Sequence, residues 1–139
     1  MDTVDATTRS KMMSSVSGKD TKPEVLVRSA LHAKGFRYRL HDKNLPGKPD
    51  LVFRRYKIAV FVHGCFWHGH NCRRGRRPSS NVEFWNKKLD KNIARDRESI
   101  VALEALGWSV VVIWECRLDE GIARTAAMLE TKRDRKLAV

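Results

Sequence analysis

Apolar and polar residues recur along the first half of the chain with periods that separate helices from strands. Residues 21–24 form a capping box, and the apolar residues that follow return at helical spacing until Gly35, which predicts one helix. Residues 36–40 alternate apolar and basic side chains, as a half-exposed strand does. Two short apolar stretches, 51–53 and 58–62, are separated by a polar connection and therefore predict an antiparallel hairpin.

The second half contains one long amphipathic pattern and one apolar run. Residues 83–106 predict a helix that ends at Gly107, and residues 108–114 are nearly all apolar, which predicts a central strand buried on both faces. Residues 64–80 are too rich in Gly, Cys, His and Arg for regular structure, and the segment from Glu120 predicts a peripheral helix. This order of elements predicts an α/β domain with helices flanking a mixed sheet.

Composition and charge narrow the class of protein. Among 139 residues, 28 Lys+Arg exceed 16 Asp+Glu and give a net charge of +12, which favours nucleic acid as the partner. A hydrophobic fraction of 42% supports a packed core rather than a disordered basic tail. No apolar run approaches the length of a membrane span, about 20 residues, and the first residues lack the apolar region of a signal peptide. We therefore expect a protein that stays inside the cell and binds no membrane.

Potential metal ligands cluster in the segment predicted to be irregular. Two cysteines and two histidines fall within residues 65–72, and Cys116 follows the apolar strand 108–114. If that strand runs parallel to 58–62, Cys116 and Cys65 emerge at the same edge of the sheet. Three cysteines and one histidine, either His68 or His70, would then form a closed structural Zn²⁺ site. The alternative is that the thiols are small buried hydrophobes and the histidines are solvated.

A carboxylate stands where an apolar residue is expected. Asp96 falls near the centre of the apolar arc of the predicted helix 83–106, and a carboxylate on such a face must be paired. Its partner is either an arginine in a structural ion pair or a histidine such as His68, whose tautomer it would fix. If His70 is the zinc ligand, His63 and His68 are not needed for zinc. A neutral imidazole is a natural general base for water, and a solvated loop histidine is the equally weighted alternative.

Two further carboxylates have both structural and chemical interpretations. Asp50 begins the predicted hairpin, and a carboxylate so placed beside a phosphate groove suits Mg²⁺, although an ordinary turn aspartate explains it too. Glu24 shares a helical face with Val27 and Leu31 and so points inward. The capping box and an i,i+4 pair with Arg28 favour a structural role for it.

Aromatic and basic residues surround the Cys/His cluster. Phe66 and Trp67 lie inside it, where there is little core to fill, and Trp85 lies at the start of the long helix. Aromatic wedges of this kind separate base steps in a duplex, and DNA contact is favoured for the first two whereas core packing is favoured for Trp85. The chain continues with four arginines that are placed to lie along phosphates: Arg73, Arg74, Arg76 and Arg77.

Together these motifs resemble one bacterial family. FVHGCFWHGHNC, then EFW, KNIARDR and GWSVVVIWEC, occur in the order found in the very-short-patch-repair (Vsr) DNA mismatch endonucleases, and TRSKMM and LPGKPDLVF match as well. The resemblance covers residues 7–118. It implies a restriction-endonuclease-like fold with a structural zinc, and an enzyme that nicks DNA 5′ of the thymine in T:G mismatches left by deamination of 5-methylcytosine.

The resemblance also implies roles for single residues. Asp50 and the backbone carbonyl of Val62 would bind Mg²⁺, His68 would be the base that acts on water, and Asp96 would orient it. His63 and Glu24 would support the active site, and Phe66, Trp67 and Trp85 would intercalate at the mismatch. Zinc would be held by Cys65, His70, Cys72 and Cys116.

A few positions depart from the family pattern. Val62 stands where threonine is familiar, Gly69 and Asn71 replace residues that are often histidine, and the lysine of related nuclease motifs is missing after the hairpin. We expect a DNA-contacting arm at 1–18, an endonuclease domain at 19–118 and a helical tail at 119–139.

The expected function follows from the residues and the resemblance together. We expect a monomeric, Mg²⁺-dependent nicking endonuclease with a structural zinc, which works on T:G mismatches in bacterial cytoplasm at the nucleoid, alongside mismatch-repair proteins. The alternatives are a zinc-containing DNA-binding module without catalysis, and a homing-type HNH nuclease that uses the histidine-rich loop for chemistry.

Overall fold

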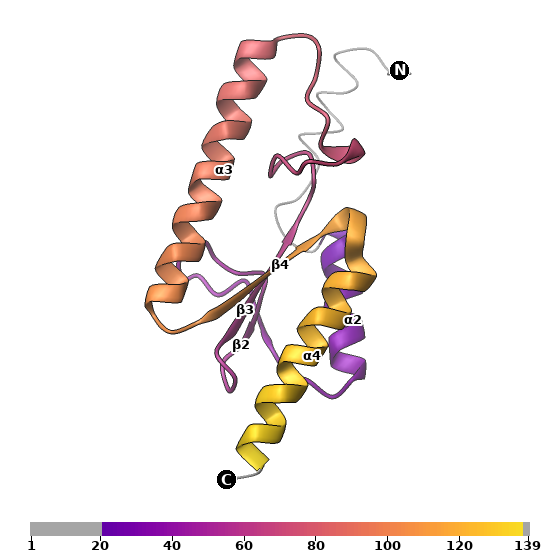
Figure 1. The fold of residues 1–139 in the computed structure, drawn as a ribbon, viewed down its shortest axis with the longest axis vertical. Coiled ribbons are helices and arrows are strands. Elements are labelled where there is room, and N and C mark those ends of the chain that lie inside the picture. The colour runs from indigo at the N-terminus through magenta and orange to yellow at the C-terminus, as the bar shows by residue number, and fades with distance from the viewer. Residues whose placement is uncertain (1–20, 138–139) are drawn as a thin grey trace.

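A computed structural model describes residues 21–137, so the predicted N-terminal arm lies outside the described residues. No helix within 21–137 is long and apolar enough to cross a membrane. Figure 1 shows the described elements in chain order: α2 (Lys22–Ala33), β1 (Arg39–Leu40), β2 (Leu51–Phe53), β3 (Ile58–His63), η1 (Arg73–Gly75), α3 (Val82–Ala105), β4 (Ser109–Trp114), η2 (Glu115–Arg117) and α4 (Leu118–Leu137).

The described strands form one mixed sheet in the order β1-β2-β3-β4, which confirms the predicted α/β class. β2 and β3 are the predicted antiparallel hairpin, and β4 pairs with β3 in parallel, from Ile58 beside Ser109 to His63 beside Trp114. The prediction that 108–114 is the central strand was wrong, because β4 is at an edge of the four-stranded sheet and β3 is interior. An apolar run arises at this edge because helices cover both faces of β4 (Figure 1).

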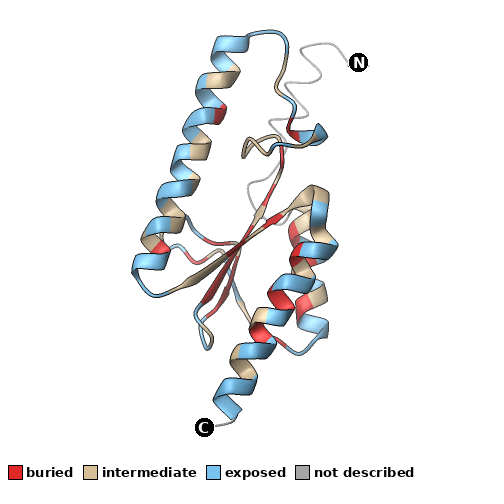
Figure 2. Ribbon diagram, in the orientation of Figure 1, coloured by how far each residue is buried: buried red, intermediate tan, exposed pale blue. Residues whose placement is uncertain are grey.

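Two layers of helix bury the two faces of the sheet. Residues Ile58 and Val60 of β3 join the core beneath α2 and α4, whereas Ala59 and Phe61 point to the opposite face, toward Leu103 of α3. This alternation follows from the period of two in a strand. Figure 2 shows the buried residues concentrated on the strands and on the inward sides of the helices. Each fully buried aliphatic side chain contributes about 1.5–3 kcal/mol.

The long helix α3 covers the predicted segment to within one residue at each end. Leu89 and Leu103 are fully buried, and Ile93 and Ile100 are half-buried on the same face. Val101 is apolar but lies off this face and is 66% exposed.

The last helix is not peripheral, as the sequence predicted, but part of the core. α4 buries Gly121, Thr125, Ala126 and Leu129 and packs against β4 and α2. A Cβ atom at Gly121 would lie 2.5 Å from Cγ2 of Ile113, so glycine permits this close approach of helix to strand. The sequence did not indicate this buried face, because the buried residues near the start of the helix are small and its end is highly charged.

Candidate active site and metal centre

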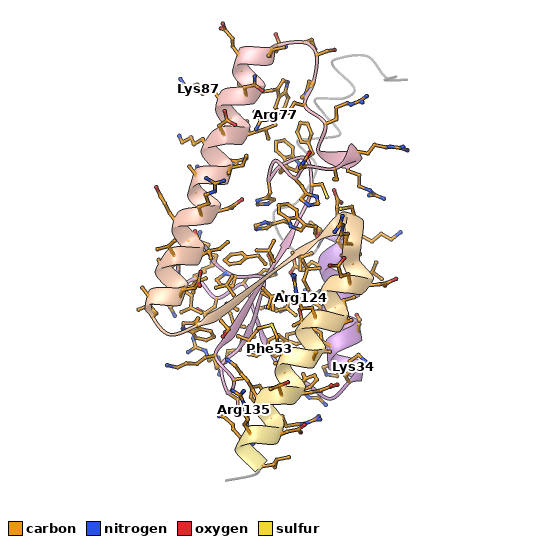
Figure 3. All side chains as sticks on the ribbon, in the orientation of Figure 1. Lys34, Phe53, Arg77, Lys87, Arg124 and Arg135 are labelled. Carbon is orange, nitrogen blue, oxygen red and sulfur yellow. The ribbon has the colours of Figure 1, made fainter. Side chains whose placement is uncertain are left out.

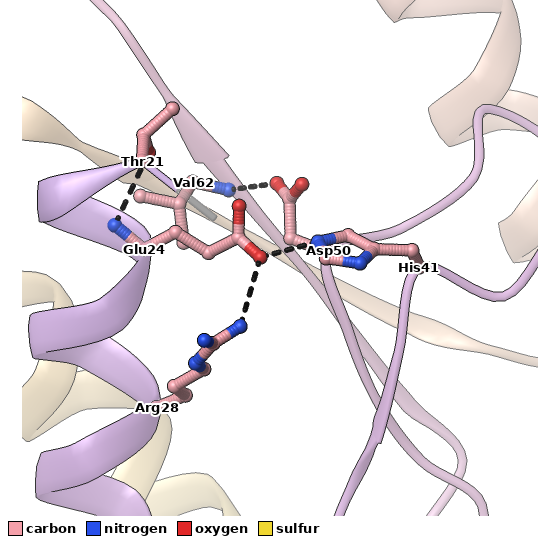
Figure 4. Close-up of polar contacts among 6 residues, drawn as sticks. All are labelled: Thr21, Glu24, Arg28, His41, Asp50 and Val62. Carbon is pink, nitrogen blue, oxygen red and sulfur yellow. Dashed lines mark hydrogen bonds and ion pairs between the residues drawn. The ribbon is translucent and has the colours of Figure 1, made fainter. Parts of the chain in front are cut away.

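The end of β3 projects beyond its neighbour β2 and forms the floor of the candidate active site. β2 begins at Leu51, opposite Val60, so Val62 has no partner strand on that side among the described residues. Its N–H donates instead to Oδ2 of Asp50 at 2.7 Å (Figure 4). The N–H and C=O of one strand residue point to the same side of the strand, so the Val62 carbonyl also faces this position.

Asp50 belongs to a cluster with Glu24 and His41. One potential ligand atom from each of the three lies within 4.8 Å of the others. Glu24 is only 2% exposed, and its Oε1 forms a hydrogen bond with Nε2 of His41 and lies 3.6 Å from Nη1 of Arg28. The capping half of the predicted motif is present, because the Glu24 N–H donates to Oγ1 of Thr21 at 3.4 Å. The side chain of Glu24 therefore points inward, toward Asp50 (Figure 4).

Burial controls the charge on Asp50. The pKa of its carboxyl rises from 3.8 to about 6. Desolvation is the largest cause and the nearby Glu24 adds to it, whereas the N–H of Val62 and the electrostatic effects of His41 and His68 oppose the rise. The carboxylate is therefore ionised at neutral pH but poorly compensated, which is a suitable state for a ligand of a divalent cation.

His68 is the partner of Asp96, for which the sequence allowed either a histidine or an arginine. Nδ1 of His68 and Oδ2 of Asp96 are 2.7 Å apart, and the side chains are 28% and 24% exposed. A carboxylate accepts from Nδ1–H, and in a neutral imidazole with this tautomer the lone pair is on Nε2. The partner of Asp96 is therefore a histidine, and not an arginine in a structural ion pair.

His63 lies directly against this pair. Its ring stacks on that of His68 with centroids 3.7 Å apart and planes 2° apart. Desolvation lowers the pKa of His63 from 6.5 to about 3, so it is neutral at physiological pH. Its buried Nδ1 has no hydrogen-bond partner among the described residues.

The second candidate centre is the predicted zinc site. Cys65, His70, Cys72 and Cys116 each place one potential ligand atom within 4.8 Å of the others, and Sγ of Cys116 is 3.5 Å from Nδ1 of His70. His70, not His68, is the histidine of this group. Burial raises the pKa of the Cys65 thiol to about 12, so a thiolate at that position needs a cation beside it. Three thiols and one imidazole are the donor set of a closed structural zinc site.

Local contacts fix the loop around this centre. The Cys65 N–H donates to Oε1 of Glu115 at 3.0 Å, and the Trp114 ring stacks on that of His70 at 4.0 Å. A side chain at Gly75 would collide with the His70 backbone carbonyl, so η1 packs against the loop only because residue 75 is glycine.

Helix α3 holds the other side of the loop through polar contacts. Nδ2 of Asn92 donates to the Trp67 carbonyl at 3.0 Å. Arg77 donates to Oδ1 of Asn86 at 2.9 Å and to Oδ1 of Asp90 at 2.7 Å. Arg77 is therefore engaged within the protein, unlike the exposed Arg73, Arg74 and Arg76, although Arg74 lies 4.0 Å from Glu115.

The predicted aromatic residues meet above the loop. Phe66 packs edge-on against Trp67 at 5.1 Å and against Trp85 at 5.4 Å, so a residue of the helix and two of the loop form one half-buried cluster. Phe84 extends it, at 5.2 Å from Trp85 and 59% exposed.

Sequence reasoning missed three residues of these sites. His41 is a single histidine in a polar loop with no spacing that marks it, and it reaches Glu24 only because the loop returns beside β2. Glu115 and Trp114 support the candidate zinc loop, and their position directly before Cys116 is the one signal that pointed to them.

Comparisons with known proteins place the chain among DNA endonucleases. The family model described as DNA mismatch endonuclease Vsr matches residues 1–74. Type II nicking enzyme V.NmeAIP of Neisseria meningitidis is 52% identical over 110 residues, which cover 79% of this chain and 79% of the relative. Type II nicking enzyme V.XorIIP of Xanthomonas oryzae is 50% identical over 112 residues, 81% and 82% of the two chains. DNA mismatch endonuclease Vsr of Escherichia coli is 44% identical over 117 residues, 84% and 75% of the two chains.

A match over more than half of the chain, together with relatives of this identity and coverage, establishes the family. The chain belongs to the Vsr family of DNA mismatch endonucleases, which confirms the resemblance that its motifs indicated.

Proposed function

We propose that this protein is a Mg²⁺-dependent DNA endonuclease that nicks one strand 5′ of the thymine in T:G mismatches arising from deamination of 5-methylcytosine. The observation that carries the proposal is the convergence of Asp50 with the His68–Asp96 pair at the end of β3, in a member of a mismatch endonuclease family. We also assign its mixed sheet to the restriction-endonuclease-like fold.

Asp50 and the carbonyl of Val62 would hold the Mg²⁺. Oxygen ligands suit this hard cation, and ionised Asp50 lies beside a projecting strand end. Mg²⁺, when bound, would polarise the scissile phosphate and stabilise charge on the leaving oxygen. Glu24, held by His41 and Arg28, would add negative charge beside Asp50.

His68 would take the proton from the attacking water. Its Nδ1–H is engaged with Asp96, so the lone pair on Nε2 is the available base. Asp96 would hold the tautomer and stabilise the imidazolium as it forms. Neutral His63, stacked flat on His68, would keep the ring in plane without adding a competing charge. The products would be a 5′-phosphate and a 3′-hydroxyl.

The aromatic cluster would recognise the distorted base pair. Phe66, Trp67 and Trp85 would insert beside the mismatch, where unstacking costs least. Arg73, Arg74 and Arg76 would contact phosphates, and Arg77 would position the loop through α3. Zn²⁺ bound by the Cys/His group would fasten this loop to the sheet.

All of these groups come from one chain, which supports action as a monomer. Cooperation with mismatch-repair proteins is the further part of the proposal, and it rests on the family resemblance alone.

A nicking assay tests the proposal against the alternative of a non-catalytic DNA-binding module. The protein is incubated with Mg²⁺ and an end-labelled duplex that carries one T:G pair, beside Asp50→Asn and the control Asp134→Asn, which removes an exposed carboxylate on α4. We expect nicking by the parent and the control, and a decrease of about 100-fold or more in Asp50→Asn with duplex binding retained. Binding without nicking by all three proteins would establish the non-catalytic module.

A further inference from the structure

A second basic surface lies at the end of the sheet opposite the candidate active site. The β2–β3 turn, Gly107 and the last turns of α4 line a groove of about 450 Å³, which we call the hairpin–α4 groove. Six of its lining residues are cationic, and no acidic residue lines it among the described residues: Arg54, Arg55, Lys57, Lys132, Arg135 and Lys136.

Neutral partners hold the groove together. Nζ of Lys132 donates to the Tyr56 carbonyl at 2.8 Å and to Oγ of Ser109 at 3.2 Å, and Nζ of Lys136 donates to the Arg55 carbonyl at 2.6 Å. Arg55 and Lys136 each lie 5.6 Å from the centroid of the Tyr56 ring. Carbonyls, a hydroxyl and a ring orient these cations without neutralising them.

Two acidic residues near the groove are each paired with an arginine. Asp42 pairs with Arg54 at 2.5 Å, and Asp134 pairs with its neighbour Arg133 at 3.5 Å. Within residues 21–137, Arg54 is the one lining cation that forms an ion pair with a carboxylate, and the other five form none. Desolvation by partial burial is the main cause that lowers the pKa of Lys132, and the positive charge of the adjacent Arg135 lowers it further.

The geometry separates this groove from the candidate active site. The groove lies at the Ile58 end of β3 and the active site at the His63 end, and six strand residues span about 17 Å. Figure 3 places Arg135 and Arg77 toward opposite ends of the molecule. The phosphates held beside the scissile bond are therefore not the ones that this groove reaches.

We propose that the hairpin–α4 groove binds the phosphate backbone of double-stranded DNA away from the mismatch, as a second, sequence-independent contact. This inference rests on the proposed function, because it takes the substrate of the active site as the polyanion. Arginines and lysines along one groove release counterions when they meet phosphates, and such contacts hold a protein on DNA while it moves between sites. An acidic protein segment is the competing ligand.

The test removes charge from the groove without loosening α4. Arg55→Gln, Lys57→Gln and Arg135→Gln are combined, because these side chains are exposed, whereas Lys132 and Lys136 fasten the helix and are kept. The matched control combines Lys22→Gln, Lys34→Gln and Lys43→Gln, which remove the same net charge at exposed positions outside the groove.

Two substrates separate this inference from the proposed function. On a long duplex without a mismatch, we expect the groove variant to bind more weakly and with a shallower salt dependence. The log–log slope should decrease by about 0.9 for each phosphate that the variant no longer neutralises. On a short T:G duplex that reaches only the active site, we expect nicking at the parental rate. Failure of the parent to nick the short duplex refutes the proposed function instead.

Two results would overturn the groove assignment. The first is parental affinity and salt slope in the groove variant on the long duplex. If that variant has also lost binding to polyglutamate, measured in the same way, the groove belongs to an acidic protein segment instead. The second is an equally weakened affinity in the control variant, since net charge alone would then explain the effect.

Discussion

Asp96→Asn removes the charge of the carboxylate that faces His68. Asparagine has nearly the same shape, but its amide offers a donor as well as an acceptor to Nδ1 of His68, which lies 2.7 Å from Oδ2 of Asp96. The substitution therefore removes the negative charge that would stabilise an imidazolium, and it also no longer fixes the tautomer that carries the proton on Nδ1. The predicted decrease appears in the rate of the chemical step and not in DNA binding.

The magnitude follows from the separation and exposure of the pair. Two unit charges about 4 Å apart at an effective dielectric constant of 20 interact by about 4 kcal/mol. Because the two side chains are 28% and 24% exposed, solvent and salt reduce this to about 1.5–3 kcal/mol. At about 1.4 kcal/mol for each factor of ten, loss of this charge alone slows nicking by about 10- to 150-fold, and a shift to the other tautomer slows it further.

Single-turnover nicking of a T:G duplex with excess protein measures this step directly. Glu98→Gln is the matched control, since it removes an exposed carboxylate from the same helix two residues away. The control is expected to nick at the parental rate. If Asp96→Asn is folded, binds the duplex and nicks as fast as the parent, His68 is not the base that Asp96 supports.

Three other perturbations test the metal centre, the charge on Asp50 and the support of Glu24. Cys116→Ala removes one of four zinc donors, so we expect reduced zinc content and a lower melting temperature, as a metal-fastened loop requires; full zinc content with parental melting would contradict it. Folding raises the pKa of Asp50 from 3.8 to about 6, so its ionised carboxylate destabilises the fold at pH 7. We therefore expect Asp50→Asn to be more stable than the parent at pH 7 without Mg²⁺, by up to about 3 kcal/mol, and the difference to narrow as pH falls below 6. Denaturation that shows a more stable parent at pH 7 contradicts this. His41→Ala removes a partner of buried Glu24, so we expect it to lower the free energy of unfolding by about 1–3 kcal/mol and to slow nicking. His41→Gln should retain most of the parental stability and nicking rate, and equal effects of the two substitutions would contradict a positioning role.

Elements with a clear period along the chain, and one residue that breaks its period, were predicted correctly from the sequence. The helix at 83–106 and the hairpin are periodic features, and the structure has them as α3 and as β2 with β3. Asp96 was identified because it interrupts an apolar arc, and a carboxylate on a buried face needs a partner. Its identity needed the structure, because arginine and His68 satisfy the same rule.

Features that depend on distant packing were not readable. An all-apolar strand is compatible with a central position and with an edge covered by helices on both faces, and β4 is the second case. α4 buries small residues such as Gly121 and Ala126, which carry little hydrophobic signal beside its charged end. His41 reaches Glu24 through a loop whose path no spacing encodes.

The central claim is that this site breaks one strand beside a T:G pair, and mapping the ends of the nicked product tests it most directly. A duplex with one T:G pair, labelled on either strand, is incubated with the protein and Mg²⁺ beside the same duplex with T:A. We predict a single break 5′ of the mismatched thymine, with a 5′-phosphate and a 3′-hydroxyl, an intact opposite strand and far slower cleavage of T:A. Breaks in both strands, equal cleavage of T:A, or no cleavage by protein that binds the duplex would contradict it.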